Sequence, residues 1–365
     1  MILHLYFGRR FLQIFGLLML VFLALLMLLD LVEQMRRFAD LDIGMDRIFG
    51  LTLLNAPGAI REILPLIVIL TTITLFVSLA RSSELVVTRA SGRSGLRALI
   101  APGAAATLIG VLSVTTLNPI VAATSSRSEQ LTEIYRTGDA AALSISGEGL
   151  WLRQGSPQGQ AVIHARRYNG ETGALLDVTM LSYSAGGGPV RRIEAEGAEL
   201  RGGYWELTGA KVWPLAAGLN PETSSATHET LRVPSTLTQD RIRSGIVSPT
   251  GVSIWELPRT IRELRQAGFT TKRHEVWLQI ELARPIFLIS MVLVAAAFTM
   301  RHTRFGGTGV AVLMSVLLGF GLFFVRNFAQ ILGENGQIPV SLAAWAPPIA
   351  SFLLALGLLL HTEDG

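Results

Sequence analysis

The chain has 365 residues, of which 50% are hydrophobic and only 16% are charged, and its mean hydropathy is +0.46. This composition excludes an ordinary soluble protein of that length and indicates a membrane protein. The charges are concentrated in one part, because residues 127–283 carry 17 basic and 17 acidic side chains. A water-facing segment is therefore expected between two apolar parts.

Several kinds of chemistry are absent from the sequence. It has no Cys, which excludes disulfides and thiolate nucleophiles. Its only Lys residues, Lys211 and Lys272, follow Ala210 and Thr271, so there is no Gly-Lys-Ser/Thr loop for nucleotide phosphates. The six His residues are scattered, and no Gly-x-Ser-x-Gly motif occurs. We expect no enzymatic activity, no metal site and no cofactor.

Six apolar segments approach the roughly 20 residues that a membrane-spanning helix requires. They are residues 11–29, 63–80, 98–121, 285–300, 305–325 and 338–360. The first is too long for a usual signal peptide and no cleavage site follows it, so we expect a retained helix.

Orientation follows from Lys and Arg in the short loops, which are kept on the cytoplasmic side. With the N-terminus inside, the inner loops hold eight Arg and the short outer loops hold five. Both termini are therefore expected in the cytoplasm, and the long segment between the third and fourth spans in the periplasm of a bacterium.

The exported segment changes to short alternating runs with Gly, Pro and Asn between them, which is typical of antiparallel strands. This pattern predicts a β-sandwich, a jelly roll or an open barrel. The expected strands are residues 150–154, 161–167, 175–182, 191–196, 204–207, 211–214 and 230–233.

Helical spacing returns after the strands. Ile254, Leu257, Ile261 and Leu264 predict one helix, and residues 274–283 predict a second helix that continues into the fourth span. The predicted domains are therefore residues 1–126 (three spans, with a cytoplasmic loop at 81–97), 127–236 (periplasmic β domain), 237–284 (helical connector) and 285–365 (three spans).

Short motifs in a fixed order resemble the lipopolysaccharide-export permease family, LptF and LptG, and are most similar to the LptG branch. They are LVEQMRR at 31–37, RSSELVVTRASG at 81–92, WELP at 255–258, LARP at 282–285, GFG at 319–321 and LAAWAP at 342–347. The resemblance extends almost from end to end and agrees with three spans, a β insert and three further spans. The implied fold class is therefore a six-helix membrane protein with an inserted, jelly-roll-like all-β domain.

The resemblance implies one permease subunit of an ABC exporter in the bacterial inner membrane. This exporter would extract lipopolysaccharide from the outer leaflet and pass it to a periplasmic bridge. The implied partners are an LptF-type permease, an LptB-type ATPase dimer that binds the ATP, and LptC-type and LptA-type bridge proteins, with no nucleic acid. The missing phosphate loop agrees with this division of labour.

The loop after the second span is expected to transmit force from the ATPase. Ser82 or Ser83 can cap a short helix whose first turn holds Glu84, and Glu84 matches the acidic position of the family's coupling helix. Leu85, Val86 and Val87 would fill a groove on the ATPase, with Arg89 near its rim. The alternative is a solvated loop whose Arg residues only fix the topology.

Basic side chains beyond the spans are candidates for the lipid head group, because guanidinium groups bind phosphate through paired hydrogen bonds. Arg36 and Arg37 follow the first span, and the resemblance implies that this position meets lipopolysaccharide. Arg127, Arg136 and Arg326 could complete a positive ring. Interfacial anchoring is the alternative for all of them. Asp30, an acid where some family members have Lys, could repel phosphate, pair with an Arg or bind through a cation.

Inward-facing residues of the β domain, including Trp151, Ile163 and Leu176, are candidates for an acyl-chain path. The alternative is that they form the core of the domain. For the whole chain, the alternative function is a membrane-anchored periplasmic scaffold with a lipid- or protein-binding β domain. A membrane enzyme ranks third, because no catalytic constellation occurs in the exported segment.

Overall fold

The computed structural model describes residues 2–39, 41, 43–84, 95–137, 143–146, 149–156, 159–168, 174–184, 188–215, 220–235, 248–266, 270–300 and 308–364. The chain divides into two compact units. The helical unit contains Met1–Ser128, Ser253–Trp255 and Lys272–Gly365, and the β unit contains Glu129–Val252 and Glu256–Thr271.

Six helices are long and apolar enough to cross a membrane. They are α1 (Ile2–Arg37), α2 (Met45–Arg81), α4 (Gly95–Leu112) with a π-helical turn η1 (Ser113–Leu117) and α5 (Asn118–Thr137), α8 (Lys272–Thr299), α9 (Thr308–Glu334) and α10 (Val340–Asp364). Together with the inserted β unit they confirm the predicted fold class. Most helices extend beyond the apolar segments expected from the sequence. Helix α2, for example, begins 18 residues before the span expected at residue 63.

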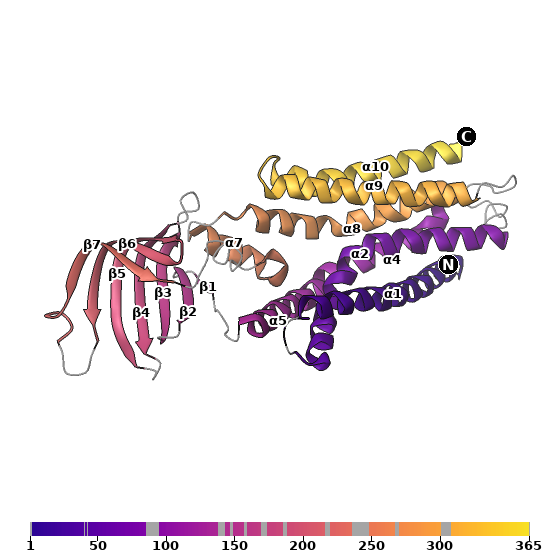
Figure 1. Cartoon of the computed structure of the whole chain (residues 1–365). Coiled ribbons are helices and arrows are strands. Elements are labelled where there is room, and N and C mark those ends of the chain that lie inside the picture. Colours follow the sequence, from indigo (N-terminus) through magenta and orange to yellow (C-terminus); the bar gives the residue numbers. More distant parts are fainter. Residues whose placement is uncertain are drawn as a thin grey trace. The chain divides into compact units, whose positions relative to one another are not determined.

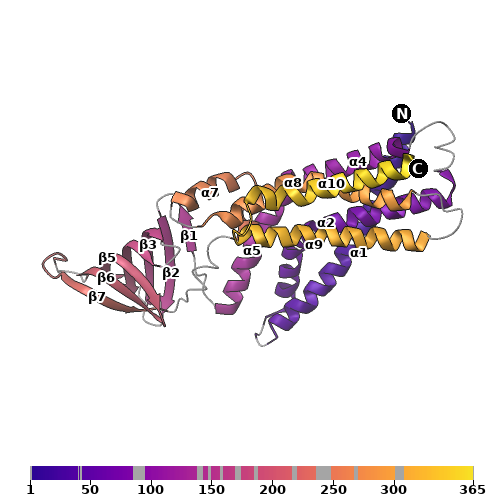
Figure 2. The same cartoon turned by 90° about the horizontal axis from the view of Figure 1, so that it is seen from above.

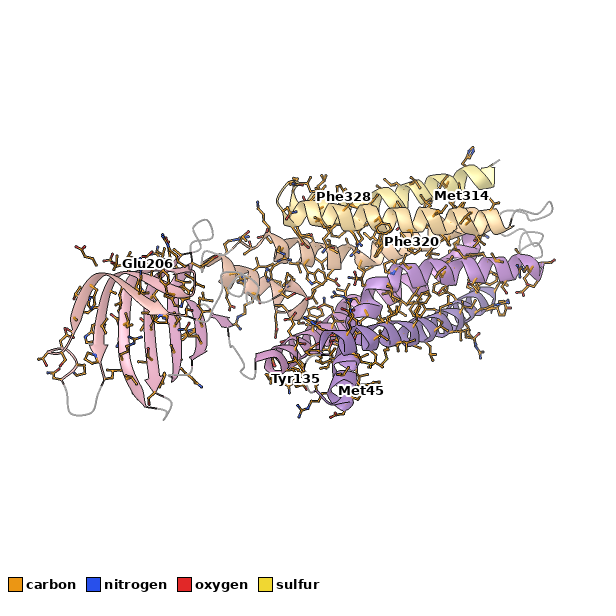
Figure 3. The ribbon with its side chains drawn as sticks, in the orientation of Figure 1. Met45, Tyr135, Glu206, Met314, Phe320 and Phe328 are labelled. Atoms are coloured by element: carbon orange, nitrogen blue, oxygen red, sulfur yellow. The ribbon has the colours of Figure 1, made fainter. Side chains whose placement is uncertain are left out.

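Helix α8 is the centre of the helical unit and packs against α2, α4, α9 and α10 (Figures 1 and 2). In its most apolar stretch 67% of the residues are buried, against 17% in α9 and 6% in α1. Met314, Phe320 and Phe328 are among the exposed apolar residues of α9 (Figure 3). Helices α1 and α9 therefore present the apolar surface that requires a lipid or protein neighbour.

Glycines allow close packing at two helix crossings. A Cβ atom at Gly110 of α4 would lie 2.7 Å from the Cα of Pro285 in α8. One at Gly319 of α9 would lie 2.2 Å from the Cδ1 of Ile69 in α2. Because the atom near Gly110 belongs to the backbone, that crossing depends on the absence of a side chain, whereas at Gly319 the terminal methyl group of Ile69 could move aside.

The β unit holds one antiparallel sheet whose seven described strands follow one another in chain order (Figure 1). They are β1 (Leu143–Ser146), β2 (Gly149–Ser156), β3 (Gly159–Tyr168), β4 (Leu175–Ser184), β5 (Pro189–Arg201), β6 (Tyr204–Pro214) and β7 (Ala226–Pro234). The sequence pattern missed the four-residue β1. It also divided β6 into two strands at Gly209.

A row of irregular positions crosses the sheet at that same glycine. Asp177 and Gly209 have positive φ angles of 54° and 61°, and the constant registers align them with Glu196. On either side of the row, buried residues are three positions apart instead of two: Leu175 and Val178, Ala195 and Ala198, Leu207 and Ala210. All six belong to one apolar core. The sheet therefore keeps the same side inward across the row.

A short helix, α7 (Leu257–Gln266), covers part of this core. It lies beside β1 and buries Leu257, Ile261 and Leu264 (Figure 1). The helix begins three residues after Ile254, which belongs to the helical unit instead. The second predicted helix does continue into the fourth span, as α8.

The Gly110 crossing gives a stability test with a control in the same helix. We expect Gly110→Ala to lower the free energy of unfolding by about 1–3 kcal/mol, because the new methyl group meets backbone atoms of α8. Gly103→Ala, which meets no atom within 4 Å, should be neutral or raise it by up to ~1 kcal/mol. Thermal unfolding in detergent checks both, and equal stabilities would contradict the crossing.

Candidate functional site

Two polar clusters lie within the apolar helical unit. The Glu84 cluster contains Tyr6, Arg10, Ser78, Ser82 and Glu84, from the N-terminal part of α1 and the C-terminal end of α2. The Arg284 cluster contains Arg61, Trp277, Glu281, Arg284 and Arg326, from α2, α8 and α9.

The turn after α2 places Glu84. Helix α2 ends at Arg81, and Ser83 adopts a φ of 60°, a left-handed conformation that often ends helices. The hydroxyl of Ser82 donates a hydrogen bond of 2.7 Å to Oε1 of Glu84. This turn holds the Glu84 carboxylate close to the last turn of α2.

Arg10 joins this carboxylate to α1. Its Nη1 donates to Glu84 Oε1 at 3.0 Å and to the hydroxyl of Tyr6 at 2.7 Å, and its Nη2 donates to Ser78 Oγ at 2.8 Å. Burial raises the pKa of Glu84, but hydrogen bonds from Ser82, Arg10 and Tyr6 outweigh it and lower the pKa below its usual value. The carboxylate is therefore charged at neutral pH.

The other predicted coupling residues, Leu85, Val86, Val87 and Arg89, lie outside the described residues, and their role stays a prediction. The sequence predicts a role for Glu84 but not its contact with Arg10. Nothing in the spacing of two residues 74 positions apart could have indicated it.

Arg284 supplies a backbone hydrogen bond that Pro65 removes from helix α2. Pro65 of α2 has no N–H to donate to the carbonyl of Arg61, four residues earlier. Nη1 of Arg284 donates to that carbonyl instead, at 3.0 Å. A carbonyl buried away from water and left unpaired would cost about 1–3 kcal/mol, so this contact compensates for the proline.

Glu281 is the anion of the same cluster and is fully buried. Its Oε2 accepts a hydrogen bond of 3.2 Å from Nε of Arg284, its Oε1 is bonded to Nη2 of Arg284, and Oε1 lies 3.9 Å from Nη1 of Arg61. The guanidinium of Arg61 is stacked 4.4 Å from the ring centre of Trp277. One carboxylate thus links α8 to α2.

Arg326 is also buried, at 8% exposure, and lies 5.3 Å from the ring centre of Phe287. It is within electrostatic reach of Arg284, Glu281 and Arg61. Sequence reasoning had considered Arg326 a candidate for a surface ring of head-group ligands. The structure instead brings it to a buried network, and its contact with lipid stays a prediction.

The remaining basic candidates are arranged differently. Arg36 and Arg37 are both exposed at the end of α1, and Arg36 pairs with Glu33 at 2.9 Å. Arg127 is exposed on α5, and Arg136 follows on the same helix, with its side chain outside the described part. Their role with lipid stays a prediction.

Asp30 does not pair with an Arg among the described contacts. Its carboxylate accepts from the Nδ2 of Asn55 and the Nε2 of Gln34, at 3.4 Å each. Asn55 in turn accepts a hydrogen bond of 2.8 Å from Ser128. Asp30 thus takes part in a polar contact between α1, α2 and α5.

In the β unit, Trp151 and Ile163 lie on opposite faces of the sheet. Ile163 is fully buried in the core, whereas Trp151 is 40% exposed and stacks on His164 at 4.3 Å. The expectation that Trp151 faces inward was wrong, because the neighbouring Leu150 and Leu152 occupy the inward positions of β2. Leu176 is half-buried, next to the irregular row.

No group of three His, Asp or Glu side chains that could hold a metal ion occurs among the residues that the structure describes.

Residues 5–361 match the family described as "Lipopolysaccharide export system permease LptF/LptG". The chain is 25% identical to the lipopolysaccharide export system permease protein LptG of Haemophilus influenzae, over 98% of both chains. It is 23% identical to the LptG protein of Escherichia coli K12, over 85% of this chain and 84% of that one.

Removing the single carboxylate of the Arg284 cluster should be costly. We expect Glu281→Ala to lower the free energy of unfolding by about 3–5 kcal/mol, because buried guanidinium groups lose their anion. Arg273→Ala breaks the more exposed Arg273–Glu334 pair, 3.7 Å apart, and should cost about 1 kcal/mol or less. Unfolding by SDS in mixed micelles measures both, and a Glu281→Ala chain as stable as Arg273→Ala would contradict the assignment.

Proposed function

Because the chain belongs to the lipopolysaccharide-export permease family LptF/LptG, we propose that it is one permease half of an exporter that extracts lipopolysaccharide from the outer leaflet of the inner membrane. The match over residues 5–361 carries this proposal. Six apolar helices agree with a multi-pass inner-membrane protein. The partner half would be an LptF-type chain, and the lipid would pass to a bridge of LptC-type and LptA-type proteins.

The apolar surfaces support a shared cavity. Helices α1 and α9 expose aliphatic and aromatic side chains along most of their length, unlike the central α8. Acyl chains and a second permease chain are the neighbours that such faces require within a bilayer. The exposed Arg36 and Arg37 at the end of α1 would meet the phosphates of the head group.

The energy would come from a separate LptB-type ATPase dimer, because the sequence has no Walker A loop of its own. Glu84 is the proposed docking residue. It is charged, partly exposed and held in place at the end of α2, where a cationic side chain of the ATPase can reach it. No resident cofactor is proposed.

Lipopolysaccharide release from vesicles tests this function. Vesicles with both permease chains and the ATPase should release the lipid only when ATP is present. We expect Glu84→Lys to reduce the bound ATPase and the release about tenfold or more, since two like charges would face each other. Glu222→Lys makes the same charge change on an exposed turn of the β unit and should behave as wild type.

Undiminished release without the ATPase would overturn the proposal. Normal release by the Glu84→Lys chain would show instead that the docking role of Glu84 is wrong. The alternative, in which the helices only anchor a periplasmic scaffold, predicts that the vesicles release no lipid with ATP or without it.

The proposed orientation places both termini in the cytoplasm and the β unit in the periplasm. Single cysteines report on it without background, because the natural sequence has none. We expect Thr223→Cys in the β unit to react with a membrane-impermeant maleimide in spheroplasts. Arg97→Cys, exposed at the start of α4, should react only after the membrane is opened. The reverse pattern would invert the topology.

A further inference from the structure

Helix α1 is most deeply buried near its ends, and Ile14 and Phe15 add partly buried contacts with the core beyond the first of them. Phe7 and Phe11 are buried near one end, and Gln34 near the other. From residue 12 to residue 33 no side chain is buried. A helix held in this way can change its position when one of its end contacts moves.

The contact of Arg10 with Glu84 lies at the first of these attachments, between Phe7 and Phe11. The fork of the guanidinium group is fixed by three acceptors. Tyr6 lies one turn earlier on α1, whereas Ser78 and Glu84 belong to the end of α2. The side chain of Arg10 therefore bonds to both helices, whereas that of its neighbour Arg9 is exposed.

We propose that Arg10 is a positioning residue that fastens α1 to the docking carboxylate of Glu84, so that force on Glu84 moves α1 as well as α2. This inference rests on the proposed function, in which Glu84 receives the ATPase. The charge-assisted bond of 3.0 Å transmits displacement because it is directional and the same guanidinium group also bonds to Ser78. The helix that it moves has the most exposed apolar stretch of the six.

The test uses the full exporter in vesicles and measures three quantities: bound ATPase, the rate of ATP hydrolysis and lipopolysaccharide released per ATP. Arg10→Ala should retain the ATPase within about twofold, because Glu84 is still present, and should reduce lipid released per ATP about fivefold or more. Arg9→Ala removes the same charge from the adjacent position and should behave as wild type.

Two further variants distinguish a positioning role of Arg10 from an effect of its charge alone and from misfolding of the Arg10→Ala chain. Arg10→Lys keeps the charge but loses the fork, so it should recover only part of the release. Ser78→Ala removes only the 2.8 Å contact with Nη2 and should shift release in the same direction by less. If Arg10→Ala fails to accumulate, these two variants decide the question.

A direct measurement of α1 complements transport. A fluorescent label at Leu20→Cys, 65% exposed on α1, should change its emission when ATP is added, and Arg10→Ala should abolish that change. A label at Leu317→Cys, 57% exposed on α9, should respond in both backgrounds.

The outcomes distinguish this inference from the function on which it rests. If Glu84→Ala leaves both ATPase binding and release unchanged, the docking role of Glu84 is wrong. If Glu84→Ala impairs them while Arg10→Ala matches Arg9→Ala and the Leu20 label still responds, only the positioning role of Arg10 is overturned. Adding Arg10→Ala to Glu84→Ala should cause no further loss.

Discussion

A backbone carbonyl that is buried away from water needs a hydrogen-bond donor, and Arg284 supplies one to the carbonyl of Arg61 in α2. Pro65 creates the need for a donor, and a side chain from α8 supplies it. The carbonyl that Pro65 leaves without its partner in α2 is therefore satisfied only while α2 and α8 stay packed together.

The Arg284 contact belongs to a cluster of charged side chains that are buried in the protein. The cluster has three guanidinium groups, and Glu281 is the one buried carboxylate that the described residues place among them, while the nearby Glu62 is exposed. Trp277 and Phe287 offset part of the excess through their ring faces. Because a buried charge tolerates little displacement from its partner, this network fixes α2 and α8 to each other. Helix α1 has no comparable contact along its middle.

The spans and most strands were predictable because they depend on local composition and period. Apolar stretches of about 20 residues are recognised from composition alone. Alternation revealed most of β3 and β4, but only six of the thirteen residues of β5 and four of the nine residues of β7. Strand β6 was divided at Gly209 for a valid reason, since that glycine does adopt a left-handed conformation, but the strand continues beyond it. Strand β1 is too short to show a period.

The site was less predictable because its contacts join distant parts of the chain. Resemblance marked Glu84, yet its partner Arg10 could be counted only as a charge that sets topology. The Arg284 cluster left one signal, a proline four residues after Arg61 and another directly after Arg284, but proline spacing does not tell which donor fills the gap. The prediction for Trp151 failed for another reason. This aromatic residue was expected on the inner face of its strand, but it lies on the other face.

The two clusters give the helices unequal freedom, and this inequality is what a force-driven permease requires. A buried ion network holds α2 and α8 as one body, whereas α1 is attached near its ends, through Arg10 and Glu84 at one of them and Asp30 and Asn55 at the other. Displacement of Glu84 would therefore change the angle of α1 before it separates α2 from α8.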